Sequence, residues 1–219
     1  MTAVKITVQG SHTVTVPPEQ ATVHASLSID GPSPDPVFAT VAASVNEVRA
    51  ALESRHDPKR GPVTRYAVDQ IRMGSHRPYN QDGTQLPLVH TAAVSITATF
   101  TDFDDLAEWV GRSAGLEGLG INYIDWALTD ANRLKTERKT RQKAVRDALR
   151  RAQDYADALD VGPVVVRSIS DPGLGGGPVQ RRVMMASAMA DPAGGPRGFT
   201  LRPEDVEIRA AVEATFTGP

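Results

Sequence analysis

The histidines are the residues of this chain best suited to hold a metal ion or to move a proton near neutral pH. They are His12, His24, His56, His76 and His90. No two of them have the spacing typical of metal ligands. His76 and His90 could approach each other across a hairpin predicted within residues 63–101, which would make a two-histidine site. We favour the alternative, a pair of solvated hairpin residues, and interpret His24 as a surface residue of a strand.

Clustered carboxylates and glycines are the next candidates for chemistry. Asp102, Asp104 and Asp105 resemble paired acid–base carboxylates, but they open a predicted helix, where capping and the helix dipole explain them. The segment GLGGGP, residues 173–178, resembles a phosphate-binding loop. However, Pro178 stands at the third glycine position of GxGxxG, and the GK[ST] ending of a P-loop is missing. We therefore expect a linker there, with no catalytic residue, no cofactor and no metal.

The absence of cysteine limits the chemistry further, and the charge balance limits the partners. Without cysteine there are no disulfides, no thiolate metal sites and no cysteine nucleophile. The formal net charge is −2, so the molecule as a whole does not attract nucleic acid or anionic lipid. Any basic surface must therefore be local.

One local basic surface is predicted on a helix that spans residues 133–151. It contains nine lysines or arginines and two acids. Such a surface resembles an electrostatic footprint for nucleic acid, but no aromatic residue interleaves with the cations to stack on bases. We therefore disfavour nucleic-acid binding and interpret these charges as a solvated face or a subunit contact.

The apolar positions of the same helix predict how it packs. At 100° per residue, one stripe contains Leu134, Val145, Leu149, Ala152, Ala156 and Leu159. Arg138 and Arg141 fall on this stripe, where a buried charge would be costly. Such a helix is also about 45 Å long at ~1.5 Å per residue, so residues 131–143 should overhang the core, in solvent or against another chain. The candidate subunit or partner contacts are Lys135, Arg138, Arg141 and Arg146.

The elements that position these residues are predicted from hydrophobic periodicity. Alternation of apolar and polar residues predicts strands at 20–30, 92–101 and 206–216, and one wet face per strand is typical of antiparallel sheets. Helices are expected after the segment SPDP, from Asp102, and from residue 129 to Gly162. Residues 20–129 then have the order β-α-β-β-α-β, the split βαβ arrangement, followed by a long helix and two strands. The predicted fold class is α+β with mainly antiparallel sheet.

The chain length, 219 residues, fits a single domain over 1–219. Within it, residues 172–203 are rich in Gly, Pro, Ala and Met and lack a clear period, so we expect a long flexible loop. Candidate contacts of this loop are Arg181, Arg182, Met184 and Met185. The beginning of the chain lacks the pattern of a signal peptide, and no stretch reaches the length of a membrane span. We therefore expect a cytoplasmic protein without a membrane span.

Three segments resemble the SIMPL domain family, which includes bacterial oxidative-stress-defence proteins and periplasmic antigens. They read ITVQGSHTVTVPPEQATVHASLSI, LTDANRLKTERKTRQKAVRDALRRAQDYADALDVGPVVVRSISD and EDVEIRAAVEATF. The chain departs from the family pattern at Glu19, where an aspartate is usual, and it lacks the export signal of many relatives. The resemblance implies an α+β fold, assembly into oligomers, and roles in stress protection or scaffolding. It implies no established enzymatic activity and supplies no catalytic residues.

Our leading prediction is therefore a non-enzymatic protein that forms a homo-oligomer and acts as a scaffold or stress-protection factor. The alternative is a monomeric or dimeric module that binds a protein partner when its 172–203 loop becomes ordered. Nucleic-acid binding through the basic helix is a weaker alternative. An enzyme is the least favoured class, and a concave pocket in which His76, His90 and aspartates converge would revive it.

Overall fold

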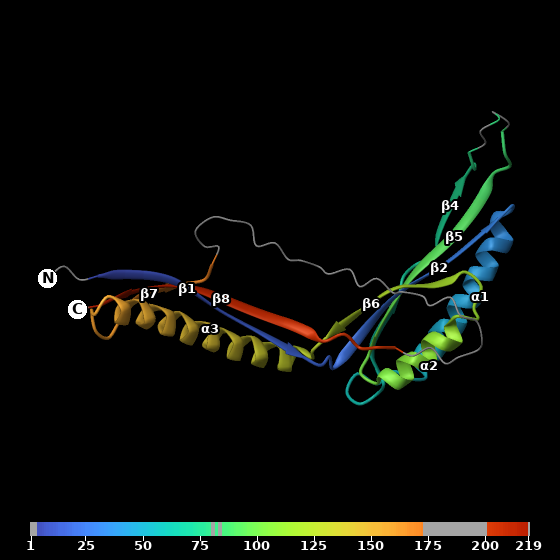
Figure 1. Ribbon diagram of the computed structural model, residues 1–219. Helices are drawn as coiled ribbons and strands as arrows, with labels where there is room; N and C mark the ends of the chain where they lie inside the picture. The colour runs from blue at the N-terminus through green and yellow to red at the C-terminus, as the bar shows by residue number, and fades with distance from the viewer. Residues whose placement is uncertain (1–3, 80–81, 83–84, 173–200, 219) are drawn as a thin grey trace. The chain divides into compact units, whose positions relative to one another are not determined.

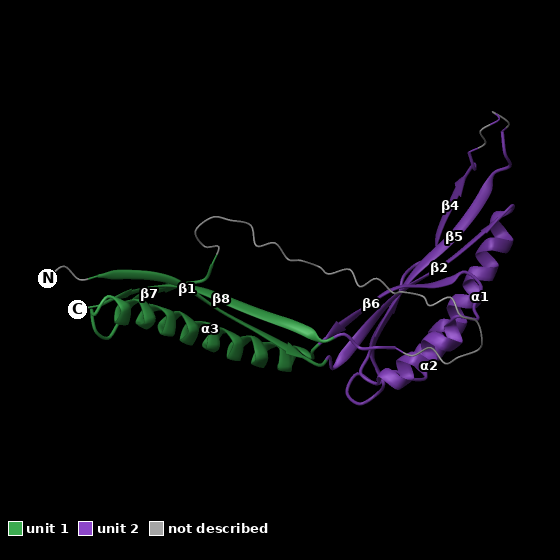
Figure 2. Cartoon of the chain, in the orientation of Figure 1, with its two compact units in different colours: residues 1–17, 128–185, 205–219 green, residues 18–127, 186–204 purple. Residues whose placement is uncertain are grey.

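The structure of the chain is a computed structural model that describes residues 4–79, 82, 85–172 and 201–218. The described chain forms two compact units (Figure 2). Unit 1 takes the described residues of 1–17, 128–185 and 205–219, so both ends of the chain contribute to it. Unit 2 takes those of 18–127 and 186–204.

Three helices and eight strands are present among the described residues (Figure 1). In chain order they are β1 (Lys5–Val16), β2 (Gln20–Gly31), α1 (Pro34–Glu53), β3 (Val63–Val68), β4 (Arg72–His76), β5 (Val89–Phe100), α2 (Phe103–Ser113), β6 (Leu119–Ala127), α3 (Asp130–Ala158), β7 (Val165–Ser170) and β8 (Val206–Thr217). All strand pairs in the two sheets are antiparallel. The predicted α+β class with mainly antiparallel sheet is confirmed.

Unit 2 has the split βαβ topology that the sequence predicts. Its sheet has the order β3-β5-β2-β6, and β4 also pairs with β5. The strand that opens the motif, β2, thus lies between β5 and β6, the two strands that flank the second helix in the chain. The alternation in β2 places Ala21, Val23, Ala25 and Leu27 in the core, while the residues between them face the other side.

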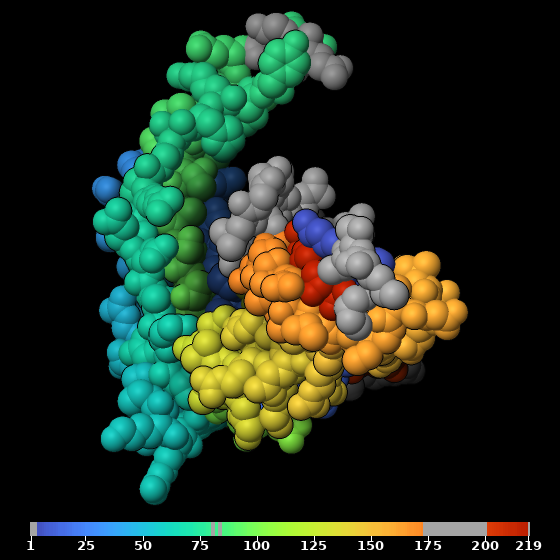
Figure 3. All heavy atoms as spheres, turned by 90° about the vertical axis from the view of Figure 1, so that its left-hand side faces the viewer, coloured from blue at the N-terminus to red at the C-terminus, as the bar shows by residue number. Residues whose placement is uncertain are grey.

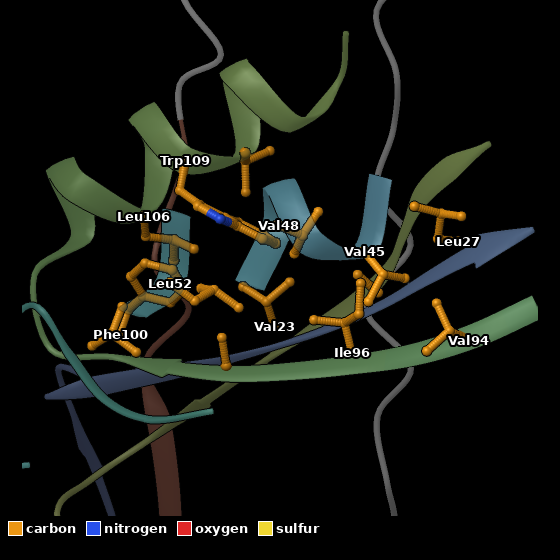
Figure 4. Close-up of a cluster of buried hydrophobic side chains, with 14 of the residues drawn as sticks. Val23, Leu27, Val45, Val48, Leu52, Val94, Ile96, Phe100, Leu106 and Trp109 are labelled. Carbon is orange, nitrogen blue, oxygen red and sulfur yellow. The ribbon is translucent and has the colours of Figure 1, made fainter. Parts of the chain in front are cut away.

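The core of unit 2 lies between this sheet and the two helices α1 and α2 (Figure 4). The buried stripe of α1 is the predicted one: Val37, Val41, Val45, Val48 and Leu52. Ser33 is the N-cap residue of α1, and Pro34 is the first helical residue. Proline suits this first position because its ring presets a helical φ and its missing N–H is not needed there. On α2, Trp109 packs against Phe100 with ring centroids 5.7 Å apart.

Unit 1 consists of a three-stranded sheet in the order β1-β8-β7 with α3 packed on one face. The strand residues buried under the helix alternate along β1 and β8. They are Ile6 and Val8 on β1, and Val212, Ala214 and Phe216 on β8. The last two strands and the long helix therefore close onto the first strand of the chain.

The core-facing row of α3 differs from the predicted stripe. The buried residues are Thr140, Ala144, Ala148, Ala152 and Ala156, each four positions apart. Ala152 and Ala156 were predicted correctly, but Leu134, Val145, Leu149 and Leu159 are 56%, 37%, 48% and 59% exposed. Because residues four apart advance about 400°, this row drifts by ~40° per step, and the prediction assumed a straight stripe of the bulkiest residues.

The physical reason for the alanine row is a close approach of helix and sheet. A Cβ atom on Gly10 of β1 would lie 2.2 Å from the carbonyl oxygen of Ala144 and 2.4 Å from the amide nitrogen of Ala148. At that separation a leucine does not fit on either side. With the alanine row toward the sheet, Arg138 and Arg141 lie outside the buried row and are exposed, so no charge is buried at these positions.

Candidate functional site

An uncovered apolar surface lies on the flank of α3 that faces β7. Val145 and Leu149 each follow a buried alanine by one residue, so they form a second row beside the alanine row. Gln153 continues this row. Its Nε2 donates to the Gly162 carbonyl oxygen at 3.2 Å, and its Oε1 accepts from the Val164 N–H at 3.0 Å. Because Val164 leads directly into β7, this row faces that strand.

Strand β7 adds two apolar side chains on the same side of the sheet. Val166 pairs with Phe216, and Ile169 pairs with Ala214. Paired residues share a face, and Phe216 and Ala214 lie under α3. Val166 and Ile169 are nevertheless 56% and 51% exposed, because α3 packs over β1 and β8 and leaves β7 uncovered.

Together these four exposed side chains, Val145, Leu149, Val166 and Ile169, form what we call the α3–β7 border. The C-terminal part of α3 and the segment that follows it, both orange, reach the molecular surface in Figure 3. The outer edge of β7 runs along this border, and no described strand pairs with it. An unpaired edge beside apolar side chains is a template for an added strand.

The opposite edge of the same sheet, on β1, is arranged differently. The Ser11 N–H donates to Asp147 Oδ2 at 3.1 Å, and Arg151 Nη1 donates to the Gln9 carbonyl oxygen at 3.4 Å. Arg151 Nε also lies 3.1 Å from Asp147 Oδ2, and Arg150 Nη2 lies 2.5 Å from Asp147 Oδ1. Two charged side chains of α3 thus bind the backbone of β1 directly.

Two ionisable groups within the described residues have shifted pKa values. The Ser11 N–H is the main cause that lowers the pKa of Asp147, with Arg151 and Arg150 adding to it and partial desolvation opposing it. Desolvation, with the neighbouring Glu53 carboxylate, raises the pKa of Tyr66. The Tyr66 hydroxyl lies 3.3 Å from Glu53 Oε1. Asp147 is therefore an acceptor held in its charged form, and Tyr66 a donor held neutral.

The basic residues predicted as contacts are all exposed on α3. Arg141 precedes Val145 by four residues, so it lies on the row that forms the α3–β7 border. Its Nη1 is 3.8 Å from Glu137 Oε2. Lys135, Arg138 and Arg146 lie off this row. The predicted loop contacts Arg181, Arg182, Met184 and Met185 lie outside the described residues, as does most of the 172–203 loop.

In the described part of the chain, His76 and His90 do not face each other. His76 pairs with Val89 and His90 with Ser75, so the two histidines occupy successive register positions and face opposite sides of the sheet. Across residues 4–79, 82, 85–172 and 201–218, no three His, Asp or Glu residues are grouped to hold a metal ion. The two-histidine site is not formed.

His24 contacts an acidic and an aromatic side chain of the neighbouring strand. Its Nε2 lies 3.1 Å from Asp125 Oδ2, and its ring stacks on Tyr123 with centroids 4.3 Å apart. All three lie on the sheet face opposite α1 and α2, which agrees with the predicted polar face of this strand. Asp125 and Tyr123 are exposed, so the cluster is a surface arrangement between two paired strands.

The carboxylates at the start of α2 have structural partners. Asp102 is the N-cap residue, and its side chain accepts from the backbone N–H groups of Asp104 and Asp105, which confirms the capping interpretation. Asp105 Oδ1 also lies 3.2 Å from Arg55 Nε, and Arg55 Nη1 donates to the Ala51 carbonyl oxygen at 3.0 Å. This ion pair joins the end of α1 to the start of α2, and the sequence did not predict it.

The α3–β7 border was also missed by sequence reasoning. The run VVVRSIS, residues 164–170, is apolar without strict alternation, which usually indicates a strand covered on both faces. Here it forms an edge strand whose six residues are all exposed. The mismatch between a buried-strand composition and an uncovered edge was the signal available in the sequence.

The sequence of the chain matches one family of known proteins across both units. In the described residues no helix has the length and apolar character needed to cross a membrane. No curated protein matches the chain. The family model described as "SIMPL: Protein of unknown function (DUF541)" matches residues 6–216, a range that runs through both units from β1 to β8. The chain belongs to the SIMPL family.

Proposed function

We propose that this chain is a non-enzymatic protein that assembles with copies of itself through unit 1, and that it serves as a scaffold or stress-protection factor. The observation that carries the proposal is the α3–β7 border beside the unpaired edge of β7. Its four apolar side chains are each between 37% and 56% exposed. An exposed apolar patch beside an open strand edge is typical of an interaction surface.

A second copy is the partner that fits this border best, because an antiparallel strand pair can be two-fold symmetric. Two β7 strands from two copies would pair edge to edge, and each copy would contribute the same residues. Arg167 does not oppose this arrangement, since its Nε donates to Thr217 Oγ1 at 3.0 Å and the side chain is held against its own sheet. The α3 rows of both copies would then cover the joined strands from one side.

The energetic gain comes mainly from burial of apolar area. Full burial of a Val, Leu or Ile side chain stabilises by about 1.5–3 kcal/mol. Since the border residues are about half exposed, each contributes roughly half of that on assembly. The hydrogen bonds of the added strand pair supply register more than affinity, because they replace bonds to water.

The experiment compares two double variants by light scattering after size-exclusion chromatography. Val166→Asp with Ile169→Asp places two charges in the α3–β7 border, and we expect it to reduce the assembly to single chains. Leu134→Asp with Leu159→Asp is the matched control, because Leu134 on α3 and Leu159, the C-cap residue of this helix, are similarly exposed but lie outside the border. An unchanged mass for the border variant, with wild-type circular dichroism, would exclude the border as the contact.

A further inference from the structure

The two edge strands of the sheet in unit 1, β1 and β7, differ in whether side chains of α3 bind their outward-facing backbone groups. This difference bears on how copies of the chain could add to one another. In β1 the Val4 carbonyl oxygen accepts from the Gly218 N–H at 3.1 Å, so even-numbered residues direct their backbone groups to β8. Odd-numbered residues direct theirs outward. Gln9 and Ser11 are therefore outward-facing residues in the middle of the exposed edge of β1.

Side chains of α3 bind both of these outward-facing residues. Asp147 accepts the Ser11 N–H, and Arg151 donates to the Gln9 carbonyl oxygen. Asp147 and Arg151 precede the buried Ala148 and Ala152 by one residue, which directs them to the β1 flank of the helix. Val145 and Leu149, which follow buried alanines, lie on the β7 flank. One flank of α3 is thus charged and closes its edge, and the other is apolar and leaves its edge open.

Asp147 and Arg151 are held in place by several contacts. The Asp147 side chain is only 14% exposed and is held by two arginines of its own helix as well as by Ser11. An incoming strand would have to displace these charged groups to reach the Ser11 N–H and the Gln9 carbonyl oxygen. Charge-assisted hydrogen bonds are stronger than those a neutral backbone offers in exchange, so the exchange is unfavourable.

We propose that Asp147 and Arg151 guard the edge of β1 against strand addition, so that this sheet accepts an added strand only at β7. The part of the inference that concerns β7 rests on the proposed function. With both edges open, β7 of one copy could pair with β1 of the next, and this head-to-tail contact would continue into open-ended polymers. With β1 guarded, the sheet-to-sheet contact closes after two copies.

The test is the double variant Asp147→Ala with Arg151→Ala in the full chain. We expect its mass, measured by light scattering, to rise severalfold between low and high protein concentration, while the wild-type mass stays constant. The matched control is Arg146→Ala with Asp154→Ala, which likewise removes one positive and one negative side chain from α3; both are exposed and lie off the border row and off the β1 flank. This control should keep the wild-type mass.

Growth through β1 can be separated from aggregation of an unfolded chain. We call the Asp147→Ala, Arg151→Ala variant the guardless variant. Adding Ser11→Pro to it removes a backbone N–H that points outward from the edge of β1. Proline is tolerated at such edge positions, because this N–H pairs with no strand. This addition should restore the wild-type mass. If it does not, the polymers form elsewhere and the guard proposal is wrong. Circular dichroism of each variant checks that the fold is retained, and Arg151→Gln alone replaces the double variant if that one unfolds.

Two outcomes keep the proposals apart. A guardless variant that is folded and keeps the wild-type mass at every concentration would overturn the guard, whatever the wild-type mass is. A wild-type chain that remains monomeric would overturn the pairing of two β7 edges, which is the contact of the proposed function, but not the pairing of β7 with an unguarded β1. Polymerisation of the guardless variant in that case would still support the guard.

Discussion

At the scale of single residues, Gly10 is a position where the packing leaves no room for a side chain. The alanine row of α3 approaches β1 so closely that a Cβ at residue 10 would meet backbone atoms of Ala144 and Ala148. Backbone atoms cannot rotate away as a flexible side chain can. The close contact between helix and sheet in unit 1 therefore depends on glycine on one side and alanine on the other.

We expect Gly10→Ala to destabilise unit 1 by about 1–3 kcal/mol, the usual cost of overpacking. The measurement is the free energy of unfolding in urea. Gly74→Ala is the control, because a Cβ at residue 74 of β4 would have no neighbour within 4 Å. Equal stability of the two variants would show that the approach of α3 to β1 is looser than described.

The lowered pKa of Asp147 predicts a pH dependence of stability. Its pKa in the folded state lies below 3.8, the ordinary value. The charged form is therefore favoured by folding, and its contribution is present above pH 3.8 and lost as the pH falls through the folded pKa. We expect the gap in thermal midpoint between wild type and Asp147→Ala to shrink as the pH falls from 7 to below 3.8. A gap that stays constant over this range would contradict the contact with Ser11.

At the scale of elements, Arg55 connects the helices of unit 2 through ion pairs with Asp105 and Glu108 of α2. Arg55 follows the end of α1, Asp105 lies in the first turn of α2, and Asp105 Oδ2 is buried without a hydrogen-bond partner among the described residues. Loss of the arginine would leave a largely buried carboxylate without its cation, which is costly.

We therefore expect Arg55→Met to lower the free energy of unfolding by about 1–3 kcal/mol, the range for leaving one partner unsatisfied. Arg133→Met is the control, because Arg133 pairs with Asp130 and Glu137 of its own helix and such exposed pairs contribute about 0–1 kcal/mol. Thermal or urea unfolding followed by circular dichroism compares them. If both variants lose the same stability, the pair does not hold α1 and α2 together.

Much of the element order could be predicted from the sequence, because alternation and capping are local signals. The stripe of α1 and the capping role of Asp102 follow from residues within a few positions of each other. The packing of α3 could not be predicted in this way. Its buried row depends on the close approach to Gly10, a residue more than a hundred positions away in the sequence. A helical wheel that ranks residues by hydrophobicity instead places leucine in the core in preference to alanine.

The candidate site escaped prediction for a related reason. Whether Val166 and Ile169 are covered depends on the order β1-β8-β7, which places β7 at an edge beyond the reach of α3. Strand order is a property of distant segments, so the composition of this strand alone could not show that it lies uncovered at an edge. Likewise, the separation of His76 from His90 depends on the register of β4 against β5, which the sequence did not determine.

At the scale of the whole molecule, the family match covers residues 6–216, and the chain is divided into two compact units. If unit 1 forms the contact between copies, unit 2 is left to present its own surfaces in each subunit. The basic face of α3 then lies beside the contact, with Arg141 on the border row.

This placement predicts the effect of charge reversal on α3. Arg138→Glu with Arg141→Glu should lower the mass of the assembly, because Arg141 precedes Val145 by one turn and a carboxylate there would lie beside Glu137. The single variants, measured by light scattering, assign the effect. We expect Arg141→Glu to account for most of it, and a loss of mass from Arg138→Glu alone would shift the contact to the outer face of the helix.

The most direct test of the account is the solution mass of the wild-type chain, by size-exclusion chromatography with light scattering at low and high salt. A contact built on apolar side chains and strand pairing predicts an even multiple of 23.4 kDa that persists at high salt, because screening weakens exposed charge pairs and not apolar burial. A mass of one chain at every concentration and both salt conditions would contradict self-assembly through unit 1.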